Sequence, residues 1–233
     1  MHRLFAPAPL LFALLAGGTL HVRDEVTADG ITRVRVHWAS GTIRVRPVTT
    51  EVTEAGVLAW GPEAPGAFSS RATGGLLSLE LGCRLPVPCG GDLELALPPG
   101  VALEVDLGEG EVLLERVDGD LTISVGQGRI AAEALGSSDA VLQVAVGEID
   151  ASWSTAPERV VLATVRGDVQ AALPPAAYHL QGLGGRVDMV GIEDSPEATR
   201  TVSVTTVEGH ARIARSVPEL AAVDEAVPGL AAL

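Results

Sequence analysis

The chain has 233 residues, of which 47% are apolar and 20% are charged, so it is long enough for one domain with a substantial hydrophobic core. Its formal net charge of -14 argues against nucleic acids and anionic lipid surfaces as partners, because both carry the same sign as the protein. We therefore expect no nucleic-acid partner.

Residues 1–18 have the features of a secretory signal peptide. Arg3 precedes an apolar core at residues 4–16 that two prolines interrupt, and a small residue, Gly18, closes the segment. The core is too short to span a bilayer, which takes about 20 apolar residues. An apolar first strand or helix of the domain is the alternative. We expect cleavage after Gly18, export to the periplasm or the outside of the cell, and no transmembrane span in the mature chain.

The first strand pattern surrounds Gly41. Apolar residues alternate on both sides of this glycine, at Val34, Val36 and Trp38 before it and at Ile43 and Val45 after it. Side chains two apart share one face of a strand, so the arginines between them should face solvent. This pattern predicts an N-terminal coil or cap. A basic patch that grips an acidic partner is the alternative to a solvated strand face.

Residues 51–75 interrupt this alternation with glycines, prolines and serines, and we expect a loop insertion there, beside a strand that ends at Trp60. Alternating leucines then predict strands at residues 77–81 and 93–97, with Cys83 and Cys89 between them. These cysteines could form a disulfide, half of a metal site or a redox pair. A zinc site needs two more ligands, and a redox pair normally has two residues between its sulfurs. In an exported protein, a structural disulfide is our interpretation.

The stretch at residues 101–213 repeats one pattern around glycines. The coil corners that we predict are Gly110, Gly128, Gly147, Gly167, Gly185 and Gly209, separated by 18 to 24 residues. Strand-like alternation precedes each corner, and a shorter alternation follows it. The shared phase predicts that the following residues point inward: Val112, Ile130, Ile149, Val169 and Val187.

A strand on either side of a glycine corner, repeated about every 20 residues, predicts a β-solenoid. One coil cannot bury its inward face alone, so neighbouring coils must stack. Six or more short coils would form a rod of roughly 25 to 30 Å at ~4.8 Å per coil. An antiparallel sandwich also has short alternating strands. The constant phase of glycine, polar residue, then apolar residue favours the solenoid.

The Gly-x-Gly-x-Val units, the segment Val117-Asp118-Gly119-Asp120-Leu121 and the cysteine segment before a Leu-Pro-Pro-Gly strand end resemble the bacterial "putative adhesin" domain of unknown function, which is related to the Toast-rack domains. The likeness covers about residues 31–214. It implies an all-β fold, a right-handed single-stranded parallel β-helix, for residues 19–215. It also implies an exported or outward-facing protein with a role in adhesion or envelope-stress sensing. This chain lacks the second hydrophobic span of membrane-anchored relatives, which puts transmembrane signalling in doubt.

The polar residues of the repeats give little support to an enzyme or a calcium site. Asp118 and Asp120 flank Gly119, an arrangement more typical of a turn than of catalysis. A calcium roll needs aspartate in every repeat, whereas the position after each corner carries mixed charges, at Glu111, Arg129, Glu148, Asp168, Arg186 and His210. We expect these side chains to form a charge ladder along one outer edge. We expect no catalytic, cofactor-binding or metal-binding residues.

Residues 216–233 form an apolar and acidic tail that either caps the open end of the rod or is disordered. Two functional classes stay open. The first, which we favour, is a non-catalytic exported module that binds a surface polymer or an envelope protein. The second is a β-helix lyase or hydrolase that acts on polysaccharide.

Overall fold

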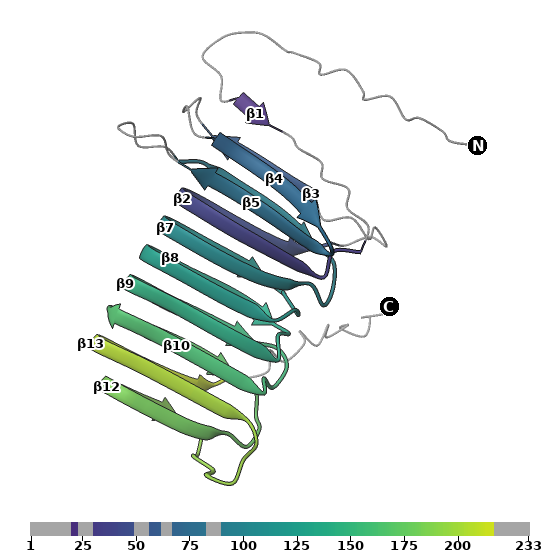
Figure 1. Cartoon of the computed structure of the whole chain (residues 1–233). Coiled ribbons are helices and arrows are strands. Elements are labelled where there is room, and N and C mark those ends of the chain that lie inside the picture. The colour runs from purple at the N-terminus through teal and green to yellow at the C-terminus, as the bar shows by residue number, and fades with distance from the viewer. Residues whose placement is uncertain (1–19, 23–29, 49–55, 62–66, 83–89, 217–233) are drawn as a thin grey trace, which may run out of the picture.

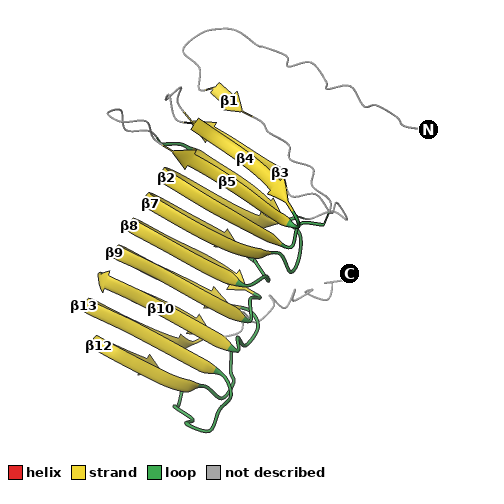
Figure 2. Ribbon diagram, in the orientation of Figure 1, coloured by secondary structure: helices red, strands yellow, loops and turns green. Residues whose placement is uncertain are grey.

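The computed structural model describes residues 20–22, 30–48, 56–61, 67–82 and 90–216. These residues form an all-β structure of thirteen strands in one mostly parallel sheet, with no helix in the described ranges (Figures 1 and 2). The strands are β1 (Leu20–Val22), β2 (Arg33–Pro47), β3 (Gly56–Gly61), β4 (Ala67–Thr73), β5 (Leu76–Gly82), β6 (Asp92–Leu97), β7 (Ala102–Glu115), β8 (Leu121–Leu135), β9 (Asp139–Trp153), β10 (Arg159–Arg166), β11 (Val169–Leu173), β12 (His179–Val190) and β13 (Thr201–Arg215).

Each long strand consists of two arms that meet at a glycine. In β7 the buried residues alternate up to Leu107, and the next buried residue is Val112, so the alternation changes phase across Gly110. We call such a pair of arms a rung. In two rungs the arms are separate strands: β10 and β11 meet at Gly167, and β5 and β6 pair with the first and second arms of β2. Figure 1 shows the rungs stacked side by side.

The rungs do not all stack in chain order. Their spatial order is β5/β6, β2, β7, β8, β9, β10/β11, β13 and β12. At one end β2 therefore lies between β5/β6 and β7, and at the other end β13 lies between β10/β11 and β12. The terminal rung is β12, although β13 is the last strand of the chain.

Inward residues from both arms form one hydrophobic core that runs through the stack from Val34 to Ile213. Ile130, Ile149 and Val169 are fully buried, in agreement with their predicted inward orientation. Val187 and Met189 are in register with the buried residues Ala211 and Ile213, but Met189 is 41% exposed and Val187 is only half-buried. Both residues lie on β12, where no further described rung covers them.

The predicted strand that ends at Trp60 is confirmed by β3 (Gly56–Gly61), but the prediction missed a second strand in this segment, β4 (Ala67–Thr73). β3 pairs antiparallel with β6, and β4 pairs antiparallel with β5 across a two-residue turn at Gly74 and Gly75, which both have positive φ. β4 has no run of alternating apolar residues that could have predicted it. Its Phe68 packs edge-on against Trp38 with ring centroids 5.9 Å apart, so β4 and β3 cover the N-terminal end of the stack.

Candidate binding surface

The corner glycines form a column in which the backbones of successive rungs are in close contact. Gly41, Gly110, Gly128, Gly147, Gly167 and Gly209 have φ between 131° and 150°. A Cβ on Gly128 would lie 1.8 Å from the carbonyl oxygen of Gly110, and the other members have the same kind of neighbour. Only glycine fits this arrangement, so the column has a structural role.

The fifth predicted corner differs from the others. The prediction placed it at Gly185, but the positive φ of 96° belongs to Gly184. The pairing of β12 with β13 shifts register between Gly184 and Arg186. Because the sequence has two adjacent glycines there, its pattern could not distinguish which of them makes the bend.

The residues after the corners lie on adjacent rungs, but they do not form the predicted ladder of ion pairs. Glu111 is opposite Arg129, and Arg129 is opposite Glu148. The Arg129 guanidinium instead contacts Asp150, at 3.3 Å. Arg186 pairs with Asp188 of its own strand, and the Asp168 carboxylate accepts a hydrogen bond from the backbone N–H of His210 at 2.8 Å.

Ion pairs between neighbouring rungs do occur at other positions. The N···O distances are 2.9 Å for Arg35–Glu104, 3.7 Å for Arg46–Glu115, 2.9 Å for Arg159–Asp139 and 2.8 Å for Arg166–Glu208. Hydrogen bonds to Asp139 and Glu208 raise the pKa values of Arg159 and Arg166, respectively. These groups are solvent-exposed and partnered, which is typical of structural pairs.

The Asp-Gly-Asp segment lies at a turn between rungs. The carboxylate of Asp118 accepts a hydrogen bond from the backbone N–H of Gly100 at 2.9 Å, and the backbone carbonyl of Asp120 accepts one from the N–H of Leu103. Gly119 approaches the carbonyl oxygen of Val101 so closely that a Cβ would clash with it. The segment therefore positions one rung on the next.

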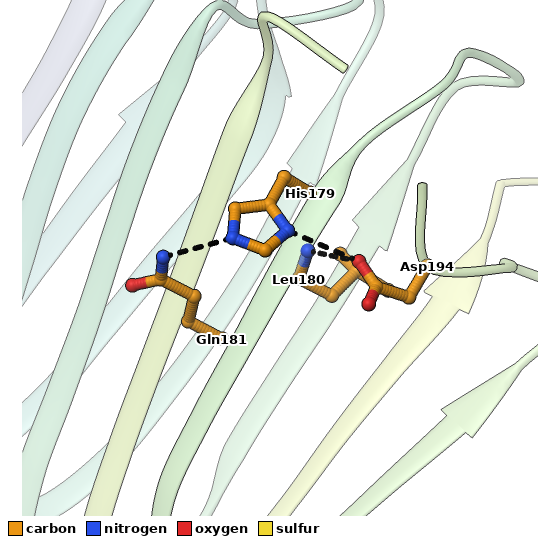
Figure 3. Close-up of polar contacts among 4 residues, drawn as sticks. All are labelled: His179, Leu180, Gln181 and Asp194. Atoms are coloured by element: carbon orange, nitrogen blue, oxygen red, sulfur yellow. Dashed lines mark hydrogen bonds and ion pairs between the residues drawn. The ribbon is translucent and has the colours of Figure 1, made fainter. Parts of the chain in front are cut away.

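One polar cluster was missed by the sequence analysis. Figure 3 shows His179, Gln181 and Asp194, which come from the first arm of β12 and from the loop that follows β12. His179 Nδ1 lies 3.3 Å from Asp194 Oδ1, and His179 Nε2 lies 3.0 Å from the Gln181 amide nitrogen. Asp194 Oδ1 also accepts the backbone N–H of Leu180 at 2.8 Å. The Asp194 carboxylate thus binds the backbone at the edge of β12. The cluster could not be found from the sequence, because its residues come together only in the folded chain.

The outer face of the first arms has a region without charged side chains. Two columns of outward residues run in register across β8, β9, β10, β13 and β12. They are Thr122, Val141, Val161, Ser203 and Gln181 in one column, and Ser124, Gln143, Ala163, Thr205 and Leu183 in the other. We call these residues the neutral face.

The neutral face has charged borders. On β7 the two columns continue with Glu104 and Asp106. At the ends of the arms lie the Arg159–Asp139 and Arg166–Glu208 pairs. Next to the latter pair, Val165 and Val207 are 57% and 62% exposed. In a chain with a net charge of -14, this face is the uncharged surface that the described rungs present.

Two hollows lie outside the neutral face. The larger, about 690 Å³, is lined by the segments around Pro174 and Asp194 and by Arg215. The smaller, about 280 Å³, lies on the outer face of the second arms of β7, β8 and β9. Within the described ranges, no group of three or more His, Cys, Asp or Glu side chains is placed to hold a metal ion.

Several predictions fall outside the described residues: the signal peptide at residues 1–18, the Cys83–Cys89 disulfide and the tail beyond Ser216. Among the residues described, no helix is long and apolar enough to cross a membrane.

Comparisons with known proteins found similarity only at the level of solved structures. No family model and no curated protein sequence matches the chain. A putative cell adhesion protein from Clostridium sporogenes is similar with a TM-score of 0.48 and 9% identity, over 85% of this chain and 100% of that one. A putative adhesin from Bacteroides fragilis has a TM-score of 0.39 and 8% identity, over 86% of this chain and 98% of its own. A putative adhesin from Parabacteroides merdae has a TM-score of 0.37 and 9% identity, over 84% of this chain and 96% of its own. The chain is thus similar in structure to solved proteins that are named as adhesins.

Proposed function

We propose that this protein is a non-catalytic, exported, adhesin-like binding module. In this proposal the rungs form a right-handed β-solenoid, and the neutral face is the surface that contacts an uncharged partner, either a surface polymer or an envelope protein. The observation that carries the proposal is the run of outward Ser, Thr, Gln, Val, Ala and Leu residues across β8, β9, β10, β13 and β12.

The chemistry of the neutral face suits a neutral ligand. Stacked strands are about 4.8 Å apart, so the five strands present a surface about 20 Å long. Its hydroxyl and amide groups can donate and accept hydrogen bonds, while its short aliphatic side chains can be covered without removing a charge from water. Anionic ligands would instead meet the carboxylates of Glu104 and Asp106 at its border.

The absence of a catalytic role is supported by what the titratable side chains already contact. Asp118 and Asp168 each accept a backbone N–H, and Asp194 accepts the N–H of Leu180 while it contacts His179. A general acid or base must be free to exchange a proton with a substrate. Each of these carboxylates has a backbone contact that gives it a structural role.

The proposal is tested by a screen of neutral polysaccharides and envelope proteins, followed by two matched substitutions. Gln143→Arg places a guanidinium in the neutral face, whereas Gln170→Arg makes the same change on the outer face of a second arm. We expect Gln143→Arg to weaken binding about tenfold or more, because the charge must be desolvated at the contact, and Gln170→Arg to change it less than about twofold. Equal effects of the two substitutions would overturn the assignment of the face.

The enzyme alternative is tested by single alanine substitutions of Asp118, Asp120, Asp168 and His210. We expect activity or binding within a few-fold of the unsubstituted protein. A loss of about a thousand-fold with an unchanged thermal melt is the size expected for a catalytic group, and it would favour a polysaccharide lyase or hydrolase.

Export is the remaining part of the proposal. It is supported by Arg3, the apolar core and Gly18 in the sequence. N-terminal sequencing of the protein secreted by its native host should begin near Thr19, and intact Met1 in a soluble cytoplasmic fraction would contradict export.

A further inference from the structure

The two ends of the stack are covered differently. At the N-terminal end, β4 and β3 pair antiparallel with the β5/β6 rung. At the other end, β12 pairs with β13 on one edge, and no strand in the described part of the chain pairs with its other edge (Figure 1). An uncovered strand edge presents unpaired backbone groups and favours pairing with other chains.

The loop after β12 protects only the beginning of the first arm. The carboxylate of Asp194 accepts the N–H of Leu180, and the N–H of Ser195 donates to the carbonyl oxygen of Tyr178. The second arm, residues 186–190, pairs with β13 and has no other backbone partner within the described ranges. Because the backbone groups of alternate residues point to opposite edges of a strand, this arm presents N–H and C=O groups that a further strand could bind.

The inward side chains of the second arm also lack a cover. Val187 is half-buried and Met189 is 41% exposed, although they are in register with the buried residues Ala211 and Ile213 of β13. A strand that paired with this edge would extend the hydrophobic core by one more rung. It would remove the apolar surface of Val187 and Met189 from water, which favours the pairing.

The charges of the second arm are self-complementary. Arg186 and Asp188 lie two residues apart on the outer face, 3.0 Å from each other, with side chains 70% and 50% exposed. In an antiparallel pair of identical strands with a two-fold axis at Val187, Arg186 of each copy lies opposite Asp188 of the other. An axis at Asp188 would place two carboxylates opposite each other, and an axis at Arg186 would do the same with two guanidinium groups. The charges therefore select the axis at Val187.

We propose that two copies of this chain associate through the second arms of β12, antiparallel about Val187. The pairing provides partners for the backbone groups of both edges and covers Val187 and Met189 of both copies. Each chain has a net charge of -14, so a contact between copies requires local charge balance, which Arg186 and Asp188 provide. Because one short strand from each copy makes the contact, the interface is small, and we expect a dissociation constant of about 1–100 μM.

Analytical ultracentrifugation over a concentration series of about 1–100 μM tests the proposal, and we expect a monomer–dimer equilibrium. Arg186→Asp and Asp188→Arg each place like charges opposite each other, so either variant alone should dissociate about tenfold more readily or more. The control is Glu148→Arg, a charge reversal on the outer face of an inner rung, which should change the dissociation constant less than about twofold. An unsubstituted chain that stays monomeric throughout the series would overturn the proposal.

A mixture of the two single variants tests the register. The Arg186→Asp chain carries carboxylates at both positions and the Asp188→Arg chain carries guanidinium groups at both, so every opposite pair in a mixed dimer again has unlike charges. We expect a mixed dimer at concentrations at which each variant alone is monomeric. Neither variant has the Arg186–Asp188 contact within its own strand, so this result would come from contacts between copies. Absence of the mixed dimer, with normal thermal melts of both variants, would overturn the two-fold register.

Hydrogen exchange of the unsubstituted chain keeps the proposal testable if a variant does not fold. We expect the peptide that contains residues 186–190 to exchange about threefold more slowly or more at the high end of the concentration series than at the low end, while peptides from β8 are unchanged. Equal exchange at both ends would overturn the proposal. Strong protection of this peptide in the monomer would also overturn it, because another part of the chain would then cover the edge.

Discussion

The Glu208 carboxylate lies 2.8 Å from the Arg166 guanidinium, and this contact joins β13, the last strand of the chain, to β10. The corner of β12 has Gly184 and Gly185 in this region and offers no carboxylate to Arg166. The pair therefore favours β13 over β12 as the neighbour of β10. Arg35–Glu104 and Arg46–Glu115 link β2 to β7 in the same way at the other end of the stack.

The first prediction concerns the Arg166–Glu208 pair. Glu208→Arg places two guanidinium groups opposite each other on adjacent strands and should lower the melting temperature by about 1–3 °C, a small effect because both side chains are exposed. Combining Glu208→Arg with Arg166→Glu should restore most of the loss in a double-mutant cycle. Additive losses in the double variant would show that the two side chains do not interact.

The second prediction concerns the glycine column. Gly128→Ala should destabilise the protein by more than about 3 kcal/mol, because its Cβ would overlap the carbonyl oxygen of Gly110 at a φ of 143°. Gly100→Ala is the control, since Gly100 has a φ of 75° but no atom within 4 Å of the position that a Cβ would take, and it should cost about 1 kcal/mol. Denaturant titration measures both. Similar costs would contradict the close approach of the rungs.

The third prediction concerns the core. Ile149 is 1% exposed between rungs, so Ile149→Asp places an unpaired carboxylate among apolar side chains and should cost several kcal/mol, enough to unfold the chain. The neighbouring Asp150→Ala removes only an exposed contact with Arg129 and should cost less than about 1 kcal/mol. Circular dichroism and thermal melts compare them. A folded Ile149→Asp protein with a normal melt would contradict the inward orientation.

The fourth prediction concerns alkaline stability. Burial raises the pKa of the Tyr178 phenol above its usual range, while Arg200 opposes this, and the hydroxyl donates to the Pro174 carbonyl at 3.0 Å. A raised folded-state pKa means that its contribution is complete below the unfolded pKa of about 10 and is lost as the pH rises through the folded value. The free energy of unfolding should therefore fall above about pH 10.

The variant Tyr178→Phe isolates this effect. It should lose about 1 kcal/mol at neutral pH with the hydrogen bond, and its stability should fall less steeply above pH 10. Denaturant titrations at a series of pH values measure both slopes. Identical slopes above pH 10 would exclude Tyr178 as the group responsible.

The fifth prediction concerns Cys83 and Cys89, which lie outside the described residues. If they form a disulfide, thiol titration of the denatured, unreduced protein should find no free cysteine. Because the loop is short, reduction should cost only about 2 kcal/mol. Two free thiols per chain would contradict the bridge.

Local features of the structure could be predicted from the sequence because they depend on local periodicity. The alternation around Gly110 or Gly147 determines which side chains point inward, and a glycine column follows from repeated corners in one phase. The hydrophobic core was therefore predictable on the inner rungs. Burial could not be predicted for Met189, since the same alternation occurs on a terminal rung that has no described rung beyond it.

The neutral face could not be predicted as a surface, because its columns join residues from strands that are far apart in the chain. Ser203 follows Val161 in space only because β13 lies next to β10. The cluster of His179 with Asp194 depends in the same way on how the loop after β12 folds back.

The sequence by itself determined the strand periodicity, the corners and the inward side chains, since each depends on residues a few positions apart. Only the tertiary structure decided the order of the rungs at the two ends. The apolar phase is the same in each rung and does not by itself specify which rungs are neighbours, whereas long-range contacts such as Arg35–Glu104 and Arg166–Glu208 join particular rungs. That choice makes β12 the exposed end and places β8, β9, β10, β13 and β12 side by side to form the neutral face.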